Sequence, residues 1–251
     1  MSASSGSKAN VVGIVVPAYK EADNIGNLVH KILEFAPDAQ IVVVDDSPDP
    51  ATQEAVERLR LPNVGVIHRN AKGGRGSAVL DGVRTLLERG CSPILEMDAD
   101  FSHPPSQIPE LLREAPARGL DMLIASRYLP ESEIHNWPFS RRVFSKCSNL
   151  LARVVLGVPI TDYTNGYRIY SLPAARLIAE TCGRKGKGFI SLSEILVNLH
   201  YRGFRVGEVP TIFVNRTRGE SSVNFEEIKN ALTGLVDIYF LKRRLRRERK
   251  G

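Results

Sequence analysis

The sequence has no long apolar segment and few cysteines. No uncharged apolar run approaches the roughly 20 residues that a membrane-spanning helix needs. Residues 1–10 lack the apolar stretch of a signal peptide and are expected to form a flexible tail. Cys91, Cys147 and Cys182 are scattered without the spacing of a metal site, which is typical of proteins in a reducing compartment. These absences predict a cytoplasmic protein without a spanning helix.

Two glycine-rich nucleotide-binding motifs are also missing. The first predicted strand, Val11 to Pro17, leads into Ala18-Tyr19-Lys20-Glu21, a turn without glycine. A dehydrogenase would carry Gly-x-Gly-x-x-Gly at this turn, so a dinucleotide is not expected there. No Walker loop is present either. The glycine-rich run Lys72 to Gly76 comes after the third predicted strand, where a flexible connection and a ligand-binding loop are equally good explanations.

Basic residues are concentrated at one end of the chain. Residues 242–251 hold seven basic groups and one acid, which accounts for the whole net charge of +6. The remaining chain is neutral, which argues against a nucleic-acid surface. We expect a basic C-terminal tail at residues 242–251 that, with the apolar helix before it, contacts an anionic membrane surface. The alternative is a core helix followed by a disordered, solubilising tail.

Strands and helices alternate along the first half of the chain. Strands are predicted at residues 11–17, 40–44, 64–67, 93–96 and 122–125, with helical spacing between them. This alternation predicts an α/β fold with a mostly parallel central sheet flanked by helices. With 251 residues and 43% hydrophobic composition, residues 11–241 are expected to form a single domain. After residue 130 the pattern changes, and Val143 to Val155 forms a strongly amphipathic helix.

Polar clusters end several of these predicted strands. Asp98-Ala99-Asp100 follows the strand at 93–96, and alternation along a strand would point both carboxylates to one side. Asp45-Asp46 and Ser126-Arg127 end two other strands. Because ligands of open α/β sheets bind at the carboxyl ends of strands, these clusters predict a site. Two neighbouring carboxylates repel unless a cation lies between them, although an Asx turn is the simpler explanation of Asp-x-Asp alone.

Several motifs carry a family resemblance, in consistent order from about residue 11 to 222. They are Pro17-Ala18-Tyr19-Lys20-Glu21, Val44-Asp45-Asp46, Asp98-Ala99-Asp100-Phe101-Ser102-His103-Pro104, Ser126-Arg127-Tyr128, Asn136 to Arg142, Thr164-Asn165-Gly166-Tyr167-Arg168, Gly207-Glu208-Val209-Pro210 and Arg216 to Ser221. The chain resembles the family-2 inverting glycosyltransferases of GT-A fold, a Rossmann-like nucleotide-sugar transferase fold. Within them it is similar to the dolichyl-phosphate (polyprenyl-phosphate) mannose synthases.

The resemblance implies transfer of mannose from GDP-mannose to a polyprenyl phosphate, with inversion. The positions it matches to the donor are Pro17, Tyr19, Glu21, Val44, Asp46, Asp98, Ala99, Asp100, Ser102, Arg127, Arg216 and Ser222. It implies Mg²⁺ or Mn²⁺ at Asp100, with Ser102 and Asp98, and the acceptor phosphate at Arg127, Arg141 and Ser145. Asp98, Asp100, Arg127 and Arg141 are then the candidate catalytic residues.

The resemblance has two departures and leaves alternatives open. Ser222 and Ile190 stand where the family has basic residues, so another donor such as UDP-glucose is an alternative. A non-catalytic membrane or nucleic-acid adaptor is a further alternative, without support from the neutral body of the chain. The resemblance also implies a peripheral enzyme on the cytosolic face of a membrane. It is compatible with a membrane-anchored partner subunit.

Overall fold

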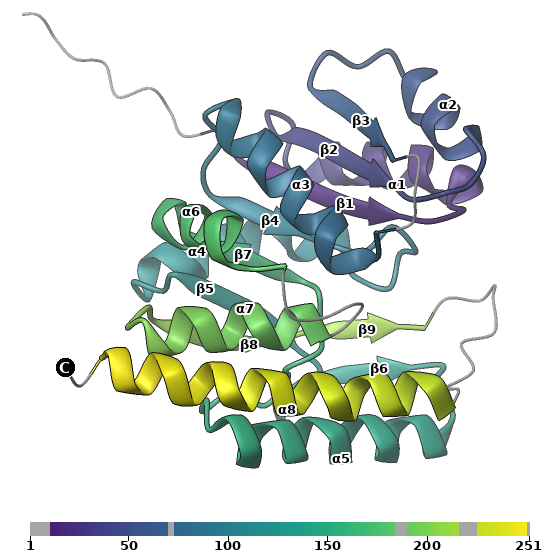
Figure 1. Cartoon of the computed structure of the whole chain (residues 1–251). Coiled ribbons are helices and arrows are strands. Elements are labelled where there is room, and N and C mark those ends of the chain that lie inside the picture. The colour runs from purple at the N-terminus through teal and green to yellow at the C-terminus, as the bar shows by residue number, and fades with distance from the viewer. Residues whose placement is uncertain (1–10, 70–72, 184–189, 216–224, 250–251) are drawn as a thin grey trace, which may run out of the picture.

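The computed structural model describes residues 11–69, 73–183, 190–215 and 225–249. A seven-stranded sheet runs through the molecule in the order β3-β2-β1-β4-β7-β5-β8, with helices on both faces (Figure 1). Its strands are β1 (Gly13–Ala18), β2 (Gln40–Asp45), β3 (Val64–His68), β4 (Ile94–Glu96), β5 (Met122–Ser126), β7 (Arg168–Tyr170) and β8 (Val206–Pro210). All neighbouring strands pair in parallel except β7, which is antiparallel to both β4 and β5. The expected α/β fold with a mostly parallel sheet is confirmed.

The helices divide between two apolar cores, one on each face of the sheet. Along β1, Ile14 and Val16 face the core under α1 (Ala22–Phe35) and α4 (Ile108–Ala117), whereas Val15 faces the opposite core. That second core lies under α3 (Arg75–Glu88), α6 (Leu172–Thr181) and α7 (Ile190–Tyr201). Alternation along a strand buried on both faces explains why its sequence is a continuous apolar run. The short helices α2 (Ala51–Glu57) and η1 (Pro105–Gln107) complete the connections.

The strand β7 is absent from the predicted pattern. Its residues Arg168, Ile169 and Tyr170 are fully or almost fully buried between β4 and β5. The sequence at this position is a polar loop motif, and an arginine in the middle of a sheet runs against strand propensity. Arg168 is accommodated because its guanidinium donates to the backbone oxygens of Tyr163, Asn165 and Leu192.

Two long helices pack side by side at the edge of the molecule beyond β8. They are α5 (Phe139–Leu156) and α8 (Phe225–Glu248), and Lys242 of α8 donates to the backbone oxygen of Val155 in α5 at 2.8 Å. The helix α8 does not end at residue 241 but continues through the basic segment, with Leu245 buried. A small parallel sheet of β6 (Glu133–His135) and β9 (Ile212–Val214) lies nearby. Among the described residues, no helix has both the length and the apolarity to cross a membrane.

The large apolar residues of α5 point outward, whereas those of a usual amphipathic helix point into the core. Its buried side chains are Asn149, Ala152 and Leu156, whereas the larger apolar residues of the predicted amphipathic stripe are exposed. On the inward face, Ala152 and Leu156 join the apolar core, while Asn149 accepts from the Tyr163 backbone N–H at 2.7 Å and donates to the Ser145 carbonyl oxygen at 2.9 Å. A hydrogen bond to the loop at Tyr163, together with the burial of small inward-facing side chains and Leu156, therefore orients α5.

The close packing of α3 on β1 can be tested with a glycine pair. A Cβ atom added at Gly82 would overlap Val15 Cγ2, whereas one added at Gly26 in α1 would lie 3.7 Å from Leu59. Gly82→Ala should lower the free energy of unfolding by about 1–3 kcal/mol, because overpacking outweighs the gain in helix propensity. Gly26→Ala should leave it unchanged or raise it by up to about 1 kcal/mol. Urea unfolding of both variants measures the difference, and equal effects would contradict the packing.

Candidate active site

A cavity of about 390 Å³ opens at the carboxyl ends of β1, β2, β4 and β5. It is lined by Pro17, Ala18, Tyr19, Glu21, Asp46, Gly74, Arg75, Ala78, Asp98, Ala99, Asp100, Ser102, Arg127, Trp137, Arg141, Thr164, Asn165, Phe213 and Asn215. This is the edge of an α/β sheet where ligands bind. The cavity carries carboxylates and guanidinium groups together, which is the arrangement needed to hold a phosphorylated ligand and a cation.

A turn, and not strand alternation, brings Asp98 and Asp100 to the cavity. The strand β4 ends at Glu96, before the first of these two residues. In the turn, the Ser102 backbone N–H donates to Asp100 Oδ1 at 3.0 Å, and Phe101 has a positive φ of 60°. The Asx turn and the functional site are therefore the same feature, since the turn places both carboxylates on the cavity wall.

His103 holds this turn in place through two hydrogen bonds and a stacked ring. Its Nδ1 accepts from the Asp98 backbone N–H at 3.1 Å, so its Nε2 carries the hydrogen and donates to Asn165 Oδ1 at 2.8 Å. The ring stacks on Tyr167 with a centroid distance of 5.0 Å. Burial lowers the pKa of His103, which outweighs the opposing effect of Asp98 and Asp100. A neutral His103 is thus a positioning residue that joins the acidic turn to the Thr164–Arg168 loop.

Arg75 is the cationic partner of the acidic turn. Its Nη2 and Nε contact Asp98 Oδ1 at 2.6 and 2.8 Å, and its Nη1 contacts Glu96 Oε1 at 2.6 Å. Glu96 is fully buried and also accepts from the Tyr170 hydroxyl at 2.7 Å. Burial by itself would raise the pKa of Asp98, but Arg75 holds it below its usual value. Asp98 is therefore ionised at neutral pH with one oxygen already bound by Arg75.

Arg75 is the residue that sequence reasoning missed. It lies in the glycine-rich run after β3, at the first residue of α3, and the residue before it, Gly74, has a φ of 86°. The sequence signal that could have identified Arg75 was the glycine-rich run around it. A flexible connection and a ligand-binding loop explained this run equally well. Only the fold shows that this loop reaches across to β4.

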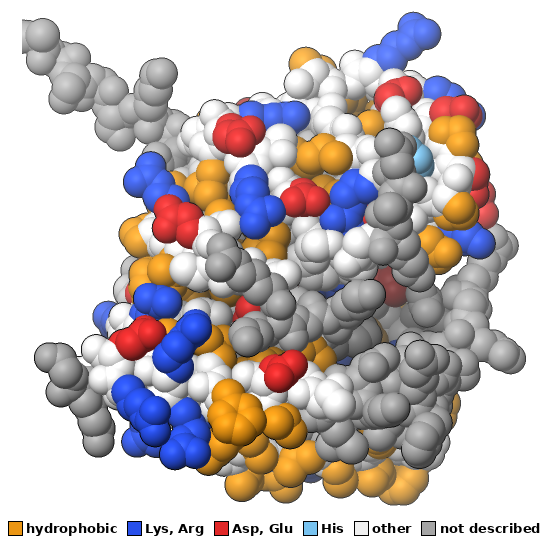
Figure 2. Space-filling view, in the orientation of Figure 1, with side chains coloured by type: hydrophobic (Ala, Val, Ile, Leu, Met, Phe, Trp, Pro, Cys, Tyr) orange, Lys and Arg blue, Asp and Glu red, His pale blue; other side chains and the backbone are white. Residues whose placement is uncertain are grey.

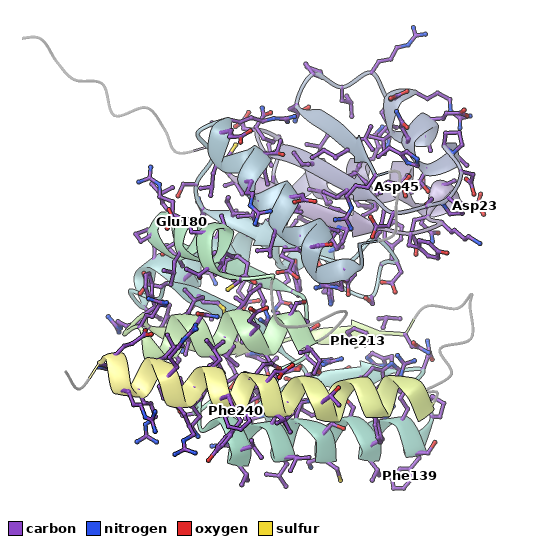
Figure 3. All side chains as sticks on the ribbon, in the orientation of Figure 1. Asp23, Asp45, Phe139, Glu180, Phe213 and Phe240 are labelled. Atoms are coloured by element: carbon purple, nitrogen blue, oxygen red, sulfur yellow. The ribbon has the colours of Figure 1, made fainter. Side chains whose placement is uncertain are left out.

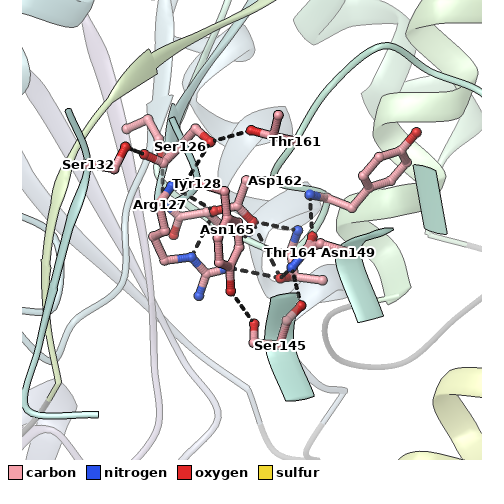
Figure 4. A network of polar contacts seen from close by, with 12 residues as sticks. Ser126, Arg127, Tyr128, Ser132, Ser145, Asn149, Thr161, Asp162, Thr164 and Asn165 are labelled. Atoms are coloured by element: carbon pink, nitrogen blue, oxygen red, sulfur yellow. Dashed lines mark hydrogen bonds and ion pairs between the residues drawn. The ribbon is translucent and has the colours of Figure 1, made fainter. Parts of the chain in front are cut away.

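Arg127 and Arg141 also line the cavity and form its basic wall. Arg127 Nε and Nη2 contact the two oxygens of Asp162 at 2.8 Å each, and Nη2 also donates to Thr164 Oγ1 at 2.8 Å (Figure 4). Burial alone would lower the pKa of Arg127, but Asp162 raises it above the usual value. Arg141, from the first turn of α5, lies 4.5 Å from the centroid of the Trp137 ring. Both guanidinium groups are held charged at fixed positions.

The loop at residues 161–165 holds Asp162 in place behind Arg127. Asp162 Oδ1 accepts from the backbone N–H groups of Thr164 and Asn165 at 3.1 and 3.0 Å. Glu208 in β8 accepts from the backbone N–H groups of Thr161 and Asp162 at 2.8 and 2.9 Å. Asp162, whose hydrogen bonds to Arg127 and Thr164 are drawn in Figure 4, thus holds Arg127 in position.

The structure brings most of the sequence-predicted residues to this cavity. Those that line it are Pro17, Tyr19, Glu21, Asp46, Asp98, Ala99, Asp100, Ser102, Arg127 and Arg141. Two do not line it. The side chain of Val44 is fully buried in the core beneath α3, because alternation along β2 points it to that face of the sheet. Ser145 accepts from the Tyr128 hydroxyl at 2.6 Å behind the basic wall. Arg216 and Ser222 lie outside the described residues.

Asp46 lines the cavity but its carboxylate is already bound. Arg69 Nη2 contacts Asp46 Oδ2 at 2.6 Å, and the Gly74 backbone N–H donates to the same oxygen at 3.0 Å. The end of β2 is thereby tied to the glycine-rich loop, which positions Arg75.

The acidic turn suits a divalent cation that a phosphate ligand helps to hold. Within the described ranges, no three His, Cys, Asp or Glu side chains are grouped so that they could hold a metal ion. Asp100 and Ser102 nevertheless offer hard oxygen ligands at the cavity wall. Mg²⁺ typically binds one or two carboxylates and completes its coordination with phosphate oxygens and water. The donor set therefore fits a cation that arrives with a phosphorylated ligand.

The role of Arg75 can be tested by unfolding. Arg75→Met leaves the buried Glu96 without its cation, and should lower the free energy of unfolding by about 3–5 kcal/mol. Arg84→Met, on the exposed side of the same helix, should lower it by less than about 1 kcal/mol. Adding Glu96→Gln to Arg75→Met should recover part of the loss, because the unpaired buried charge is removed. Similar losses for Arg75→Met and Arg84→Met in urea unfolding would show that the buried pair is unimportant.

The chain is similar to known proteins of one family. Residues 13–177 match the family described as glycosyl transferase family 2. The polyprenol monophosphomannose synthase of Mycolicibacterium smegmatis is 36% identical over 222 residues, covering 87% of this chain and 83% of the relative. The undecaprenyl-phosphate mannosyltransferase of Micrococcus luteus is 38% identical over 217 residues, covering 84% of this chain and 86% of the relative.

A solved structure shows the same fold. The glucosyl-3-phosphoglycerate synthase of Mycobacterium tuberculosis superposes with a TM-score of 0.65 at 17% identity, over 92% of this chain and 80% of that chain. At this identity the likeness concerns the fold alone. The family match over residues 13–177 and the two relatives show that the chain belongs to glycosyl transferase family 2, as a glycosyltransferase of GT-A fold.

Proposed function

We propose that this glycosyltransferase transfers mannose from GDP-mannose to a polyprenyl phosphate, with inversion at the sugar. The observation that carries the proposal is the division of one cavity into an acidic wall around Asp100 and a basic wall of Arg127 and Arg141. Such a reaction brings together a nucleotide diphosphate and a second phosphate. Two relatives named as polyprenyl-phosphate mannose-transferring enzymes, at 36% and 38% identity, support the choice of sugar and acceptor.

The donor is assigned to the side of the cavity formed by β1 and β2. Pro17, Tyr19 and Glu21 would contact the guanosine, and Asp46 would keep the glycine-rich loop closed beside it. Ala99, Asp100 and Ser102 would face the diphosphate. Mg²⁺ or Mn²⁺ bound by Asp100, with Ser102, would neutralise the diphosphate as it leaves. We assign Asp98 a positioning role, because Arg75 already binds one of its oxygens.

The acceptor phosphate is assigned to the basic wall. Arg127 and Arg141 would hold its oxygens, and guanidinium groups suit this task because their planar fork meets two phosphate oxygens at once. A phosphate oxygen attacks C1 of the mannose while the bond from C1 to the diphosphate oxygen breaks, and GDP leaves with the bonding electrons. The acceptor is already ionised at neutral pH, so no general base is needed. Ser145 would act indirectly, because it accepts a hydrogen bond from Tyr128 and so positions that residue next to Arg127.

The donor nucleotide is the least constrained part of the proposal. Ile190, at the start of α7, stands at a position where the resemblance implies a cation, and Arg216 and Ser222 lie outside the described residues. Arg75 supplies a guanidinium to the same cavity. A UDP-sugar, such as UDP-glucose, is therefore the alternative donor.

An activity panel tests the reaction. GDP-mannose and UDP-glucose are each incubated with a short, detergent-dispersed polyprenyl phosphate and Mg²⁺ or Mn²⁺. We expect transfer from GDP-mannose alone, and loss of at least about a thousandfold in kcat for Asp100→Ala, because several kcal/mol of charge stabilisation are removed. The exposed Asp38→Ala variant is the control and should keep full activity. Transfer from UDP-glucose alone would overturn the donor, and near-normal turnover of Asp100→Ala would overturn the cation site.

The acceptor side is tested separately with Arg141→Lys. The variant keeps the positive charge but loses the planar fork, so the KM for the acceptor should rise about tenfold or more. Binding of GDP with Mn²⁺, measured by calorimetry, should be unchanged. Arg113→Lys on α4 is the control, since this exposed arginine lies outside the cavity. An equal weakening of GDP binding would move Arg141 to the donor side.

A further inference from the structure

Trp137, the single tryptophan of the chain, lines the candidate active site. The exposed apolar side chains of α5 gather along the lower edge of the molecule in Figure 2, whereas Trp137 is 7% exposed. Its indole is therefore enclosed by protein at the wall of the cavity. An enclosed indole normally has a hydrogen-bond acceptor for its N–H group.

The link between β6 and α5 fixes the position of this indole. Asn136 has a φ of 59°, in the left-handed region that asparagine tolerates better than most residues. The following Pro138 favours an extended backbone at Trp137. The Asn215 backbone N–H donates to the His135 oxygen at 3.1 Å, and Asn215 Nδ2 donates to the Asn136 oxygen at 3.2 Å. The backbone that leads into Trp137 is thus tied to the end of β9.

Two guanidinium groups and one aromatic ring contact the indole. The Cζ atoms of Arg141 and Arg127 lie 4.5 and 5.4 Å from the centroid of its ring. The ring of Phe213, which Figure 3 labels on β9, lies 5.3 Å away between centroids, with the two ring planes at 65°. The indole thus contacts both arginines of the basic wall.

The indole N–H group is a buried donor without an acceptor. Among the buried side-chain nitrogen and oxygen atoms of the described residues, Trp137 Nε1 alone lacks a hydrogen-bond partner. A buried donor that is left unsatisfied carries the full penalty of its removal from water. A contact of the N–H group with the face of the Phe213 ring is weaker than a hydrogen bond to an oxygen. We therefore expect this group to gain an acceptor when a ligand fills the cavity.

Arg127 has few donors left for a ligand. Its Nε and Nη2 atoms donate to Asp162 and Thr164, which leaves Nη1 as its donor toward the cavity. A phosphate monoester carries three strong acceptor oxygens. A phosphate bound by Arg127 and Arg141 therefore has acceptor capacity for a further donor beside them.

We propose that the Nε1–H group of Trp137 donates a hydrogen bond to an oxygen of the acceptor phosphate, beside Arg127 and Arg141. The proposal rests on the proposed function, which places that phosphate at the basic wall. Because Nε1 is buried, the side chain of Arg141 must turn toward the phosphate before an oxygen can reach the N–H group. A hydrogen bond to an ionised oxygen is roughly twice as strong as one between neutral groups. A neutral donor also adds no repulsion to that between the two arginines.

Biosynthetic replacement of tryptophan tests the hydrogen bond, because the chain has a single tryptophan and the replacement changes residue 137 alone. In 3-benzothienylalanine a sulfur atom takes the place of the indole N–H group with little change in ring size. The KM for a short polyprenyl phosphate should rise about tenfold, because a hydrogen bond to a charged group is lost. The kcat should stay within about twofold, since the bond holds the bound acceptor before and during the reaction. Trp137→Phe, which also lacks the N–H group, should raise the KM in the same direction.

The matched comparison is 5-fluorotryptophan, which is incorporated in the same way and keeps the N–H group. It should bring the acceptor KM back to within about twofold of the wild-type value. Binding of GDP with Mn²⁺, measured by calorimetry, should be equal for the two analogues. A purely structural role of the indole would lower the unfolding temperature but leave the KM of the folded enzyme unchanged. Equal acceptor KM values for the two analogues would therefore overturn the proposal.

Nuclear magnetic resonance of the wild-type enzyme observes the hydrogen bond directly. With isotope-labelled tryptophan the protein gives one indole N–H resonance, because it has one tryptophan. Inorganic phosphate and a short polyprenyl phosphate should each move this proton downfield, since a hydrogen-bonded proton is deshielded. A resonance that saturating acceptor leaves in place would contradict the proposal. So would a downfield shift that GDP-mannose with Mg²⁺ causes and phosphate does not, because the N–H group would then serve the donor.

The resonance is recorded without any turnover, which separates this proposal from the proposed function. A downfield shift with phosphate in an enzyme that transfers no mannose would refute the proposed function and support the phosphate contact of Trp137. Mannose transfer with equal acceptor KM values for the two analogues would support the proposed function and refute the contact.

Discussion

The arrangement of the cavity depends on the pairing of buried charges at the carboxyl edge of the sheet. Arg75 lies between Glu96 and Asp98 and thereby joins the first turn of α3 to β4. Arg127 is paired with Asp162 in the same manner on the other side. Charges removed from water are tolerated only with close partners, so neither pair can shift without a large energetic cost. The two guanidinium groups consequently stay at fixed positions across one cavity.

These ion pairs give the cavity an acidic side and a basic side, and a glycosyl transfer between phosphates requires both. On the acidic side, Asp98 is committed to Arg75, which leaves Asp100 as the carboxylate at the turn with a cation-binding role in the proposal. On the basic side, Asp162 satisfies part of Arg127, while Trp137 and Phe213 cover its guanidinium with ring centroids 5.4 and 5.3 Å away. The aromatic rings reduce access of water, which strengthens the attraction of the arginines for an anionic ligand.

The helix α5 connects this chemistry to the surface of the molecule. Its inward face is held by the hydrogen bond that the Tyr163 backbone N–H donates to Asn149 and by the burial of Ala152 and Leu156 in the core, whereas its larger apolar side chains face outward. Arg141 lies at one end of the helix on the cavity, and the exposed apolar row occupies the outer side. One rigid element thereby carries both a guanidinium of the cavity, which serves the acceptor phosphate in the proposed function, and an exposed apolar row.

The sequence by itself determined the five parallel strands, the helices between them and the rim position of Asp98, Asp100 and Arg127. These follow from local signals: continuous apolar runs, helical spacing and polar residues at strand ends. The resemblance added Tyr19, Glu21 and Arg141, which line the cavity. The tertiary structure alone decided three features. Arg75 pairs with β4 through a contact across 21 and 23 residues, which no local pattern encodes. Arg168 enters the sheet because backbone oxygens from distant segments accept its hydrogen bonds. The apolar stripe of α5 faces outward, which the sequence could not show. Helical periodicity defines which residues share a face, but only the packing partners decide which face is buried.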